Sequence, residues 1–62
     1  MRILIADDNQ FVRRGVAEIL ARLADCDVCA EASNDLEALQ KSLEMRPDLV
    51  LLDISMPGTS GL

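Results

Sequence analysis

The chain has 62 residues, of which 50% are hydrophobic and 27% are charged, and its formal net charge is −5. This length excludes two domains, the hydrophobic content excludes a disordered chain, and the negative charge argues against direct nucleic-acid binding. The N-terminus has no signal-peptide pattern, and no apolar stretch approaches the roughly 20 residues that span a bilayer. We therefore expect a cytoplasmic protein with no membrane partner.

The N-terminal segment predicts a strand followed by an amphipathic helix. Arg2 to Ala6 is a short apolar run that ends at two aspartates, which is typical of a buried strand. Asn9 is a suitable N-cap for a helix from Gln10 to about Leu23, because apolar residues recur there at helical spacing. The predicted apolar stripe of this helix consists of Val12, Val16, Ile19, Leu20 and Leu23.

The middle of the chain predicts a second strand and a second helix. Val28 to Ala32 is a weaker strand, interrupted by Glu31. Asn34 and Glu37 have the spacing of a capping box at the start of a helix. Pro47 ends this helix, because the residue before a proline is pushed out of the α region. The predicted buried stripe of the second helix consists of Leu36, Leu39 and Leu43.

A third strand, Leu49 to Leu52, is apolar on both faces and ends at Asp53, ahead of a turn-forming loop at Met56 to Gly61. Strands that alternate with helices predict a parallel sheet with right-handed crossovers. The sequence therefore predicts an α/β fold, in which three parallel strands form part of a doubly wound sheet.

Carboxylates follow the first and third strands at the point where each strand ends. Asp7 and Asp8 end the first strand, and Asp53 ends the third. Ligands of parallel α/β sheets bind beyond the carboxyl ends of the strands, where the strand order reverses. Each aspartate taken singly is equally consistent with a turn or cap residue. An acid pair and a single acid at neighbouring strand ends together favour a shared cleft.

The chemistry expected of such a cleft is that of a divalent cation. Three carboxylates repel one another unless a cation holds them, and Mg²⁺ prefers carboxylate oxygens and retained waters as ligands. A carboxylate beside Mg²⁺ can attack a phosphoryl group and form an acyl phosphate. We therefore take Mg²⁺ as the expected cofactor.

Cys26 and Cys29 have the Cys-x-x-Cys spacing of a redox motif or of half a zinc site. A zinc site usually needs two further Cys or His ligands, and the sequence contains no His and no other Cys. A redox pair usually lies at a helix N-terminus, whereas Cys29 lies in the predicted second strand. We therefore predict two reduced thiols without a catalytic role.

The motifs at the two strand ends, and the residues around them, resemble receiver domains of two-component response regulators. The resemblance covers the whole chain and is strongest with the branch whose output is a C-terminal helix-turn-helix DNA-binding domain. It implies a flavodoxin-like doubly wound fold, of which residues 1–62 would supply three strands, two helices and the start of the following loop. The matching segments are Ile3 to Asn9, Val12-Arg13, Asp48 to Gly58 and Ser60 to Leu62.

The resemblance also implies a role for each site residue. Asp53 would be the phosphoacceptor, which takes a phosphoryl group from a sensor histidine kinase. Asp8 would bind Mg²⁺ directly and Asp7 through a water. The backbone carbonyl of Ser55 would be the third protein ligand beside Asp8 and Asp53, and its side chain would influence hydrolysis. Many members of that branch have His at the position of Asn9, a small departure that leaves the acid pair itself unchanged.

The chain departs from the family pattern chiefly in length. Family domains are roughly twice as long, near the usual domain size, and the hydroxyl residue, the Lys and the output face have no counterpart in these 62 residues. Any contact with DNA would therefore need a separate C-terminal domain. An alternative reading is an inactive half-domain that self-associates through the third strand.

A second alternative is a metal-dependent phosphatase or phosphotransferase with an aspartyl-phosphate intermediate. Such enzymes usually carry a second aspartate two residues after the nucleophile. Ser55 stands there in this sequence, so we expect a phosphoacceptor signalling domain and not an enzyme.

Overall fold

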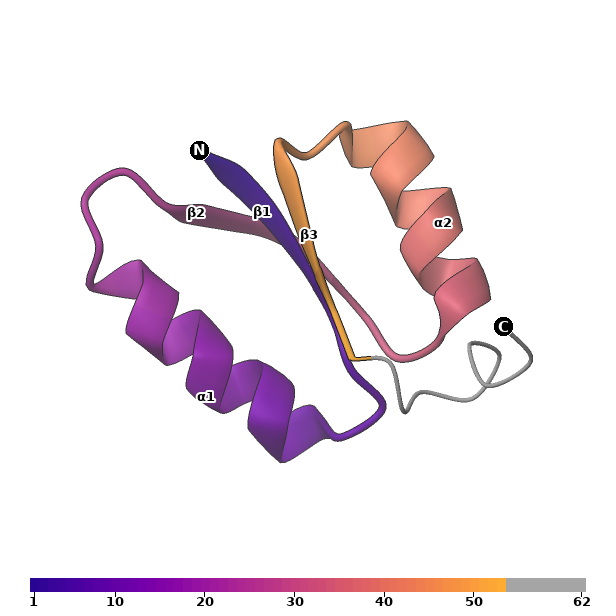
Figure 1. The fold of residues 1–62 in the computed structure, drawn as a ribbon, viewed down its shortest axis with the longest axis horizontal. Helices are drawn as coiled ribbons and strands as arrows, with labels where there is room; N and C mark the ends of the chain where they lie inside the picture. The colour runs from indigo at the N-terminus through magenta and orange to yellow at the C-terminus, as the bar shows by residue number, and fades with distance from the viewer. Residues whose placement is uncertain (54–62) are drawn as a thin grey trace.

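The computed structural model describes residues 1–53 of the chain. Three strands alternate with two helices, in the predicted order (Figure 1). The loop predicted at Met56 to Gly61 lies outside the described residues. The elements are β1 (Arg2–Ala6), α1 (Gln10–Ala21), β2 (Asp27–Ala32), α2 (Asp35–Met45) and β3 (Leu49–Leu52).

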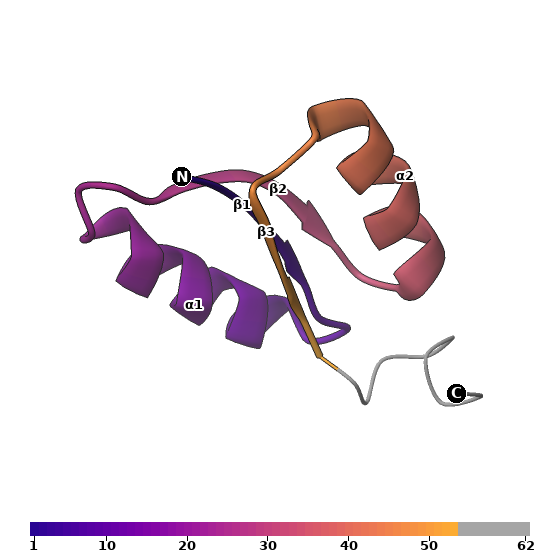
Figure 2. The same cartoon turned by 45° about the horizontal axis from the view of Figure 1, so that its top comes forward.

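The three strands form one parallel sheet in the order β2-β1-β3. Strand β3 lies on the opposite side of β1 from β2, so strand order differs from chain order. The crossover from β1 to β2 and the crossover from β2 to β3 therefore run in opposite directions across the sheet. Right-handed crossovers then place α1 and α2 on opposite faces of the sheet, as Figures 1 and 2 show. The predicted parallel α/β fold is therefore confirmed.

The buried core is centred on β1, the middle strand. Its apolar residues from Ile3 to Ala6 are at most 3% exposed, because neighbouring strands flank it and a helix lies on each face. Ala32 of β2 and Ala38 of α2 pack against Leu4 and Ala6. These small side chains let α2 lie close to the end of β1 that carries Asp7.

The predicted buried stripe of α2 is wrong. Its three leucines are 56–70% exposed, whereas Ala38 is 6% exposed. The face towards β1 and β2 carries Ala38 and, seven residues further on, the half-buried Met45. Helix α2 thus packs through its alanine face, and the described residues leave the leucine face uncovered. The three leucines are Leu36, Leu39 and Leu43.

The apolar stripe of α1 is only partly covered. Val16 and Leu20 are half-buried, while Val12, Ile19 and Leu23 are 45–61% exposed. The helix ends at Ala21, two residues before the predicted end, because the amide N–H groups of Arg22 and Leu23 bond to carbonyls three residues back and tighten the last turn.

Both helices begin at the predicted caps. The Asn9 carboxamide accepts hydrogen bonds from the amides of Phe11 and Val12. Asn34 caps α2 through the amide of Glu37, but the Glu37 carboxylate reaches back to the amide of Ser33 rather than to that of Asn34. The first bond of the predicted capping box is therefore present, and the second goes to the residue before the cap.

Helix α2 ends at Met45, and its C-cap is Arg46, whose φ of 49° and ψ of 60° lie in the left-handed region. The sequence correctly predicts that the residue before Pro47 leaves the α region. A left-handed residue here ends the helix in the manner usually supplied by glycine. It is the only non-glycine residue with positive φ between residues 1 and 53.

Strand β3 is the least covered element of the sheet. Its four residues, Leu49 to Leu52, are 36–47% exposed. Strand β1 pairs with one edge of β3, and residues 1–53 place no strand along the other edge. Neither helix in this part of the chain is long and apolar enough to cross a membrane.

Strand β2 contains a bulge at Cys29. Ile3 pairs with Val28 and Leu4 with Ala30, so Cys29 is the extra residue between them. Both cysteines are free thiols and half-buried. Cys26 lies just before β2 and Cys29 within it, so neither lies at a helix N-terminus that would lower the pKa of a redox thiol.

We therefore expect no disulfide between Cys26 and Cys29 in a mild glutathione buffer. Mass measurement after alkylation of the native chain should show two labelled thiols, one at each cysteine. A single alkylation-resistant pair, or tight stoichiometric binding of zinc, would contradict this prediction.

Candidate functional site

The register of the sheet brings the ends of β1 and β3 together. Ala6 pairs with Leu52, so the next residues along each strand, Asp7 and Asp53, leave the sheet side by side. The Asp53 amide donates a 2.9 Å hydrogen bond to the Ala6 carbonyl, and the Asp7 amide donates a 3.0 Å bond to the carbonyl of Ala32 on β2. These backbone hydrogen bonds therefore fix the positions of the Cα atoms of Asp7 and Asp53, from which the two carboxylates extend.

Three carboxylates meet at this edge, as the sequence predicts. Asp7, Asp8 and Asp53 each place one carboxylate oxygen within 4.8 Å of the other two. Asp7 and Asp53 are half-buried, and Asp8 is exposed. Ser55, the further ligand that the resemblance implies, lies outside the described residues. Clustered anionic oxygens at this spacing are the donor set that a hard divalent cation prefers.

The turn from β1 into α1 is held by hydrogen bonds on either side of Asp8. The amide of Asn9 donates to Oδ1 of Asp7 at 2.9 Å. The carboxamide of Asn9 in turn caps α1. Asp7 and Asn9 are thus engaged in local bonds, while the carboxylate of Asp8 extends to solvent.

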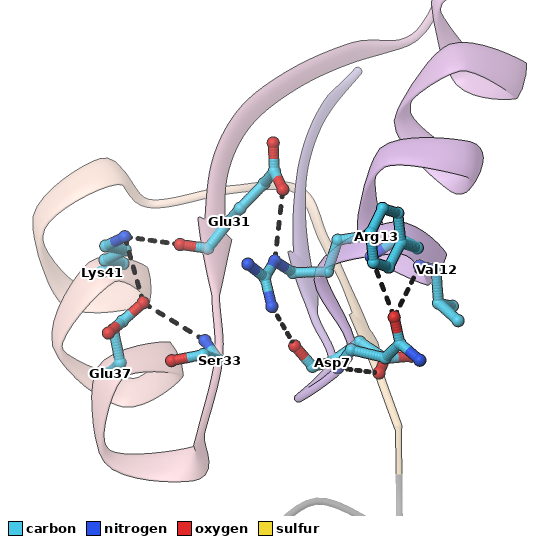
Figure 3. A network of polar contacts seen from close by, with 9 residues as sticks. Asp7, Val12, Arg13, Glu31, Ser33, Glu37 and Lys41 are labelled. Atoms are coloured by element: carbon cyan, nitrogen blue, oxygen red, sulfur yellow. Dashed lines mark hydrogen bonds and ion pairs between the residues drawn. The ribbon is translucent and has the colours of Figure 1, made fainter.

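Arg13 joins this turn to the neighbouring strand. One guanidinium nitrogen donates to the main-chain carbonyl of Asp7, and Nε donates to a carboxylate oxygen of Glu31 at 3.3 Å (Figure 3). The Arg13 side chain is 16% exposed and that of Glu31 is 46% exposed. Sequence reasoning missed this role of Arg13. The signal that could have indicated it is Glu31, a charged residue within the predicted second strand.

A second polar chain links β2 to α2 in Figure 3. The Lys41 ammonium donates to the Glu31 carbonyl and, at 3.3 Å, to the Glu37 carboxylate. The same carboxylate oxygen accepts the amide of Ser33 at 3.2 Å. The Lys41 hydrogen bond is the main cause that lowers the pKa of Glu37, and the Lys41 charge and the Ser33 amide act in the same direction.

Replacing Lys41 with Met should raise the pKa of Glu37 towards the ordinary value of a glutamate. A lowered folded-state pKa means that this carboxylate favours folding above its unfolded pKa, and that the contribution is lost as pH falls through the folded value. The contribution is small, because the pair is exposed. An NMR pH titration of the Glu37 side chain measures the shift, and Lys41→Arg is the control that should preserve it. An unchanged pKa in Lys41→Met would contradict the assigned cause.

A shallow apolar pocket of about 340 Å³ lies beside the carboxylates. Its walls come from β1, α1 and β3, and Asp7 and Asp53 form its polar rim. The apolar lining consists of Ile5, Ala6, Val16, Leu51 and Leu52.

A doubly wound parallel sheet with an acid cluster at its switch point defines the class of this protein. The profile of the response regulator receiver domain matches residues 3–62. The chain therefore belongs to the response regulator receiver domain family of two-component systems, which is a family of signalling domains.

Relatives of known role support the same assignment. The oxygen regulatory protein NreC of Staphylococcus epidermidis is 52% identical over 63 residues, which cover 100% of this chain and 29% of the relative. The response regulator GacA of Pseudomonas viridiflava is 40% identical over 62 residues, with the same coverage of 100% and 29%. The chain thus spans under a third of the length of these relatives.

Solved structures agree with the fold. The response regulator domain of Thermotoga maritima CheB superposes with a TM-score of 0.90 at 36% identity, over 94% of this chain and 43% of that one. The signal receiver domain of the NarL protein of Mycobacterium tuberculosis gives a TM-score of 0.87 at 35% identity, over 92% and 46%. The predicted flavodoxin-like receiver fold is therefore confirmed.

Proposed function

We propose that this chain is the phosphoacceptor part of a receiver domain, with Asp53 as the phosphorylated residue. The observation that carries the proposal is the meeting of Asp7, Asp8 and Asp53 at the carboxyl edge of the sheet. Residues 1–62 would supply the first three strands and two helices of the domain.

The residues present fit a Mg²⁺ ion. Three carboxylates of formal negative charge lie close together, and two of them are only half-buried, so a hydrated cation can reach them. Asp8 and Asp53 would bind it directly, Asp7 would hold one of its waters, and the Ser55 carbonyl would complete the protein ligands. When bound, the ion offsets the negative charge that gathers on the transferred phosphoryl group.

The reaction that the chain's own residues perform is a nucleophilic attack. A carboxylate oxygen of Asp53 attacks phosphorus, a new P–O bond forms, and the bond from phosphorus to the donor breaks, with its electron pair leaving on the donor. Hydrogen bonding of the Asp53 amide to the Ala6 carbonyl fixes the backbone of the nucleophile during this step. The product is an acyl phosphate on the Asp53 side chain.

The proposed donor in the cell is a sensor histidine kinase, since the relatives include response regulators. We propose a cytoplasmic location, and contact with DNA only through another domain. The second candidate is a self-associating half-domain without chemistry, which the exposed β3 strand favours.

Incubation of the chain with acetyl phosphate, with Mg²⁺ or with EDTA, separates the two candidates. A receiver should gain the mass of one phosphoryl group in the presence of Mg²⁺ only, as measured on the intact chain. An inert half-domain gains none under either condition. Gain of mass that is equal with EDTA would contradict the role of the cation.

The cation site should also be seen directly with Mn²⁺. Paramagnetic line broadening should centre on Asp7, Asp8 and Asp53, and Asp8→Asn should weaken binding by at least the roughly 10–100-fold that loss of an outer partner costs. Asp25→Asn is the matched control, because Asp25 is exposed and lies beyond α1, before β2. Broadening spread evenly over all acidic residues would rule the site out.

A further inference from the structure

We propose that Arg13 is a positioning residue for the cation site, which it serves by fixing the peptide that joins Asp7 to Asp8. The inference rests on the proposed function, because it concerns the same acid cluster. It begins from the guanidinium of Arg13, which bonds at once to the Asp7 carbonyl and to the Glu31 carboxylate.

The Asp7 carbonyl belongs to the planar peptide group that ends in the amide of Asp8. The orientation of this plane sets the directions in which both side chains leave the backbone. The preceding peptide is already fixed by the bond from the Asp7 amide to the Ala32 carbonyl. Arg13 fixes the following one, so the turn is held on both sides of the Asp7 Cα atom.

Arg13 also bonds to Glu31, which lies on a different element from the turn between β1 and α1. Glu31 is in β2, whose neighbouring residue Ala32 also pairs with the turn. The guanidinium is a planar group with several donors that point in fixed, different directions. It can therefore span the turn and the strand together. A lysine ammonium at this position is a single point charge and cannot reproduce both contacts in the same fixed geometry.

The charge of Arg13 acts in the opposite sense to its proposed role. A positive side chain beside Asp7 repels a cation at the cluster. If Arg13 acted only through its charge, its removal would tighten cation binding. If it acts by holding the turn, removal weakens binding although the repulsion is gone. The two effects differ in sign, so one measurement separates them.

The test uses Arg13→Lys and Arg13→Gln, with Arg14→Lys and Arg14→Gln as matched controls. Arg14 is exposed on the same helix, and its side chain has no hydrogen bond or ion pair within residues 1–53. Mn²⁺ affinity is measured from the free-ion EPR signal, in trimethylamine N-oxide to favour the folded chain. Both Arg13 variants should bind about tenfold more weakly, as is usual for loss of an outer partner, and both controls should match the wild type.

A second readout needs no metal. Hydrogen exchange should become faster in Arg13→Lys at the amides of Asp7 and Asn9, which bond to the Ala32 carbonyl and to Asp7 Oδ1, while the amide of Ile19 in α1 keeps its wild-type protection. This pattern is local to the turn, and a general loss of stability would not produce it.

Three results would overturn the proposal. One is wild-type affinity in Arg13→Lys with tighter binding in Arg13→Gln, which would assign Arg13 a purely electrostatic effect. Another is faster hydrogen exchange throughout α1, which would show that Arg13 contributes to the general stability of the fold. The third is unchanged hydrogen exchange at the amides of Asp7 and Asn9. If the wild type itself binds no Mn²⁺ at the cluster, the proposed function fails, and the exchange measurement still decides the role of Arg13 in the turn.

Discussion

Asp53→Asn should abolish phosphoryl labelling of the chain by acetyl phosphate or phosphoramidate in the presence of Mg²⁺. An amide lacks the anionic oxygen that attacks phosphorus, while its size and its backbone bond to Ala6 are unchanged. Intact mass measurement gives the labelled fraction, and peptide mapping after borohydride reduction gives the residue. We expect slow, partial labelling of the wild type, because the Lys and hydroxyl residue of the family pattern have no counterpart in these 62 residues.

Two controls sharpen this result. Asp25→Asn removes the same charge far from the cluster and should label as the wild type does. Asp8→Asn keeps the nucleophile but removes a proposed cation ligand, so its labelling should fall and lose its dependence on Mg²⁺. Labelling that persists in Asp53→Asn and disappears with another aspartate would show that the nucleophile is assigned wrongly.

The second large effect is self-association of the 62-residue chain in solution. Strand β3 presents an edge with no partner strand among residues 1–53, and its side chains are all apolar and 36–47% exposed. An open, uncharged edge is a template for pairing with another chain. Full burial of each such side chain contributes about 1.5–3 kcal/mol, which is large beside a domain stability of about 5–15 kcal/mol.

Sedimentation equilibrium at micromolar concentration should therefore show dimers or larger species. Val50→Lys places a charge on the open strand and should shift the chain towards monomer. Gln40→Lys adds the same charge at an exposed position of α2 and should leave association unchanged. A wild-type monomer, with a cooperative thermal transition that does not depend on concentration, would refute the prediction.

The sequence predicts the order of elements, both helix caps and the meeting of the three aspartates. These features follow from local signals: Asn9 and Asn34 stand where caps are needed, and apolar runs end at acids. Alternation of strands and helices predicts parallel strands but does not by itself fix their order. The carboxylates meet because the sheet has the order β2-β1-β3, which makes the ends of β1 and β3 neighbours.

Packing is where sequence reasoning fails. The three leucines of α2 form the clearest apolar stripe, yet the helix contacts the sheet through Ala38. Helical spacing identifies an apolar face but not which face has a partner, and a small residue can be favoured because it allows close approach. Arg13 was missed for a related reason: its contact depends on Glu31, on an element that sequence spacing does not place beside it.

The pairing of β1 with β3 makes the acid cluster a product of the whole chain. Asp7 lies near one end of the sequence and Asp53 near the other, so the cluster is absent until both crossovers have formed and the two strands are in register. Such long-range pairing carries a loop-closure entropy and slows folding.

A cation that binds the assembled cluster and not the unfolded chain therefore shifts the folding equilibrium by mass action. Raising its concentration should increase the folded population as well as the occupancy of the site. Folding and loading of the cluster are one coupled equilibrium in this chain.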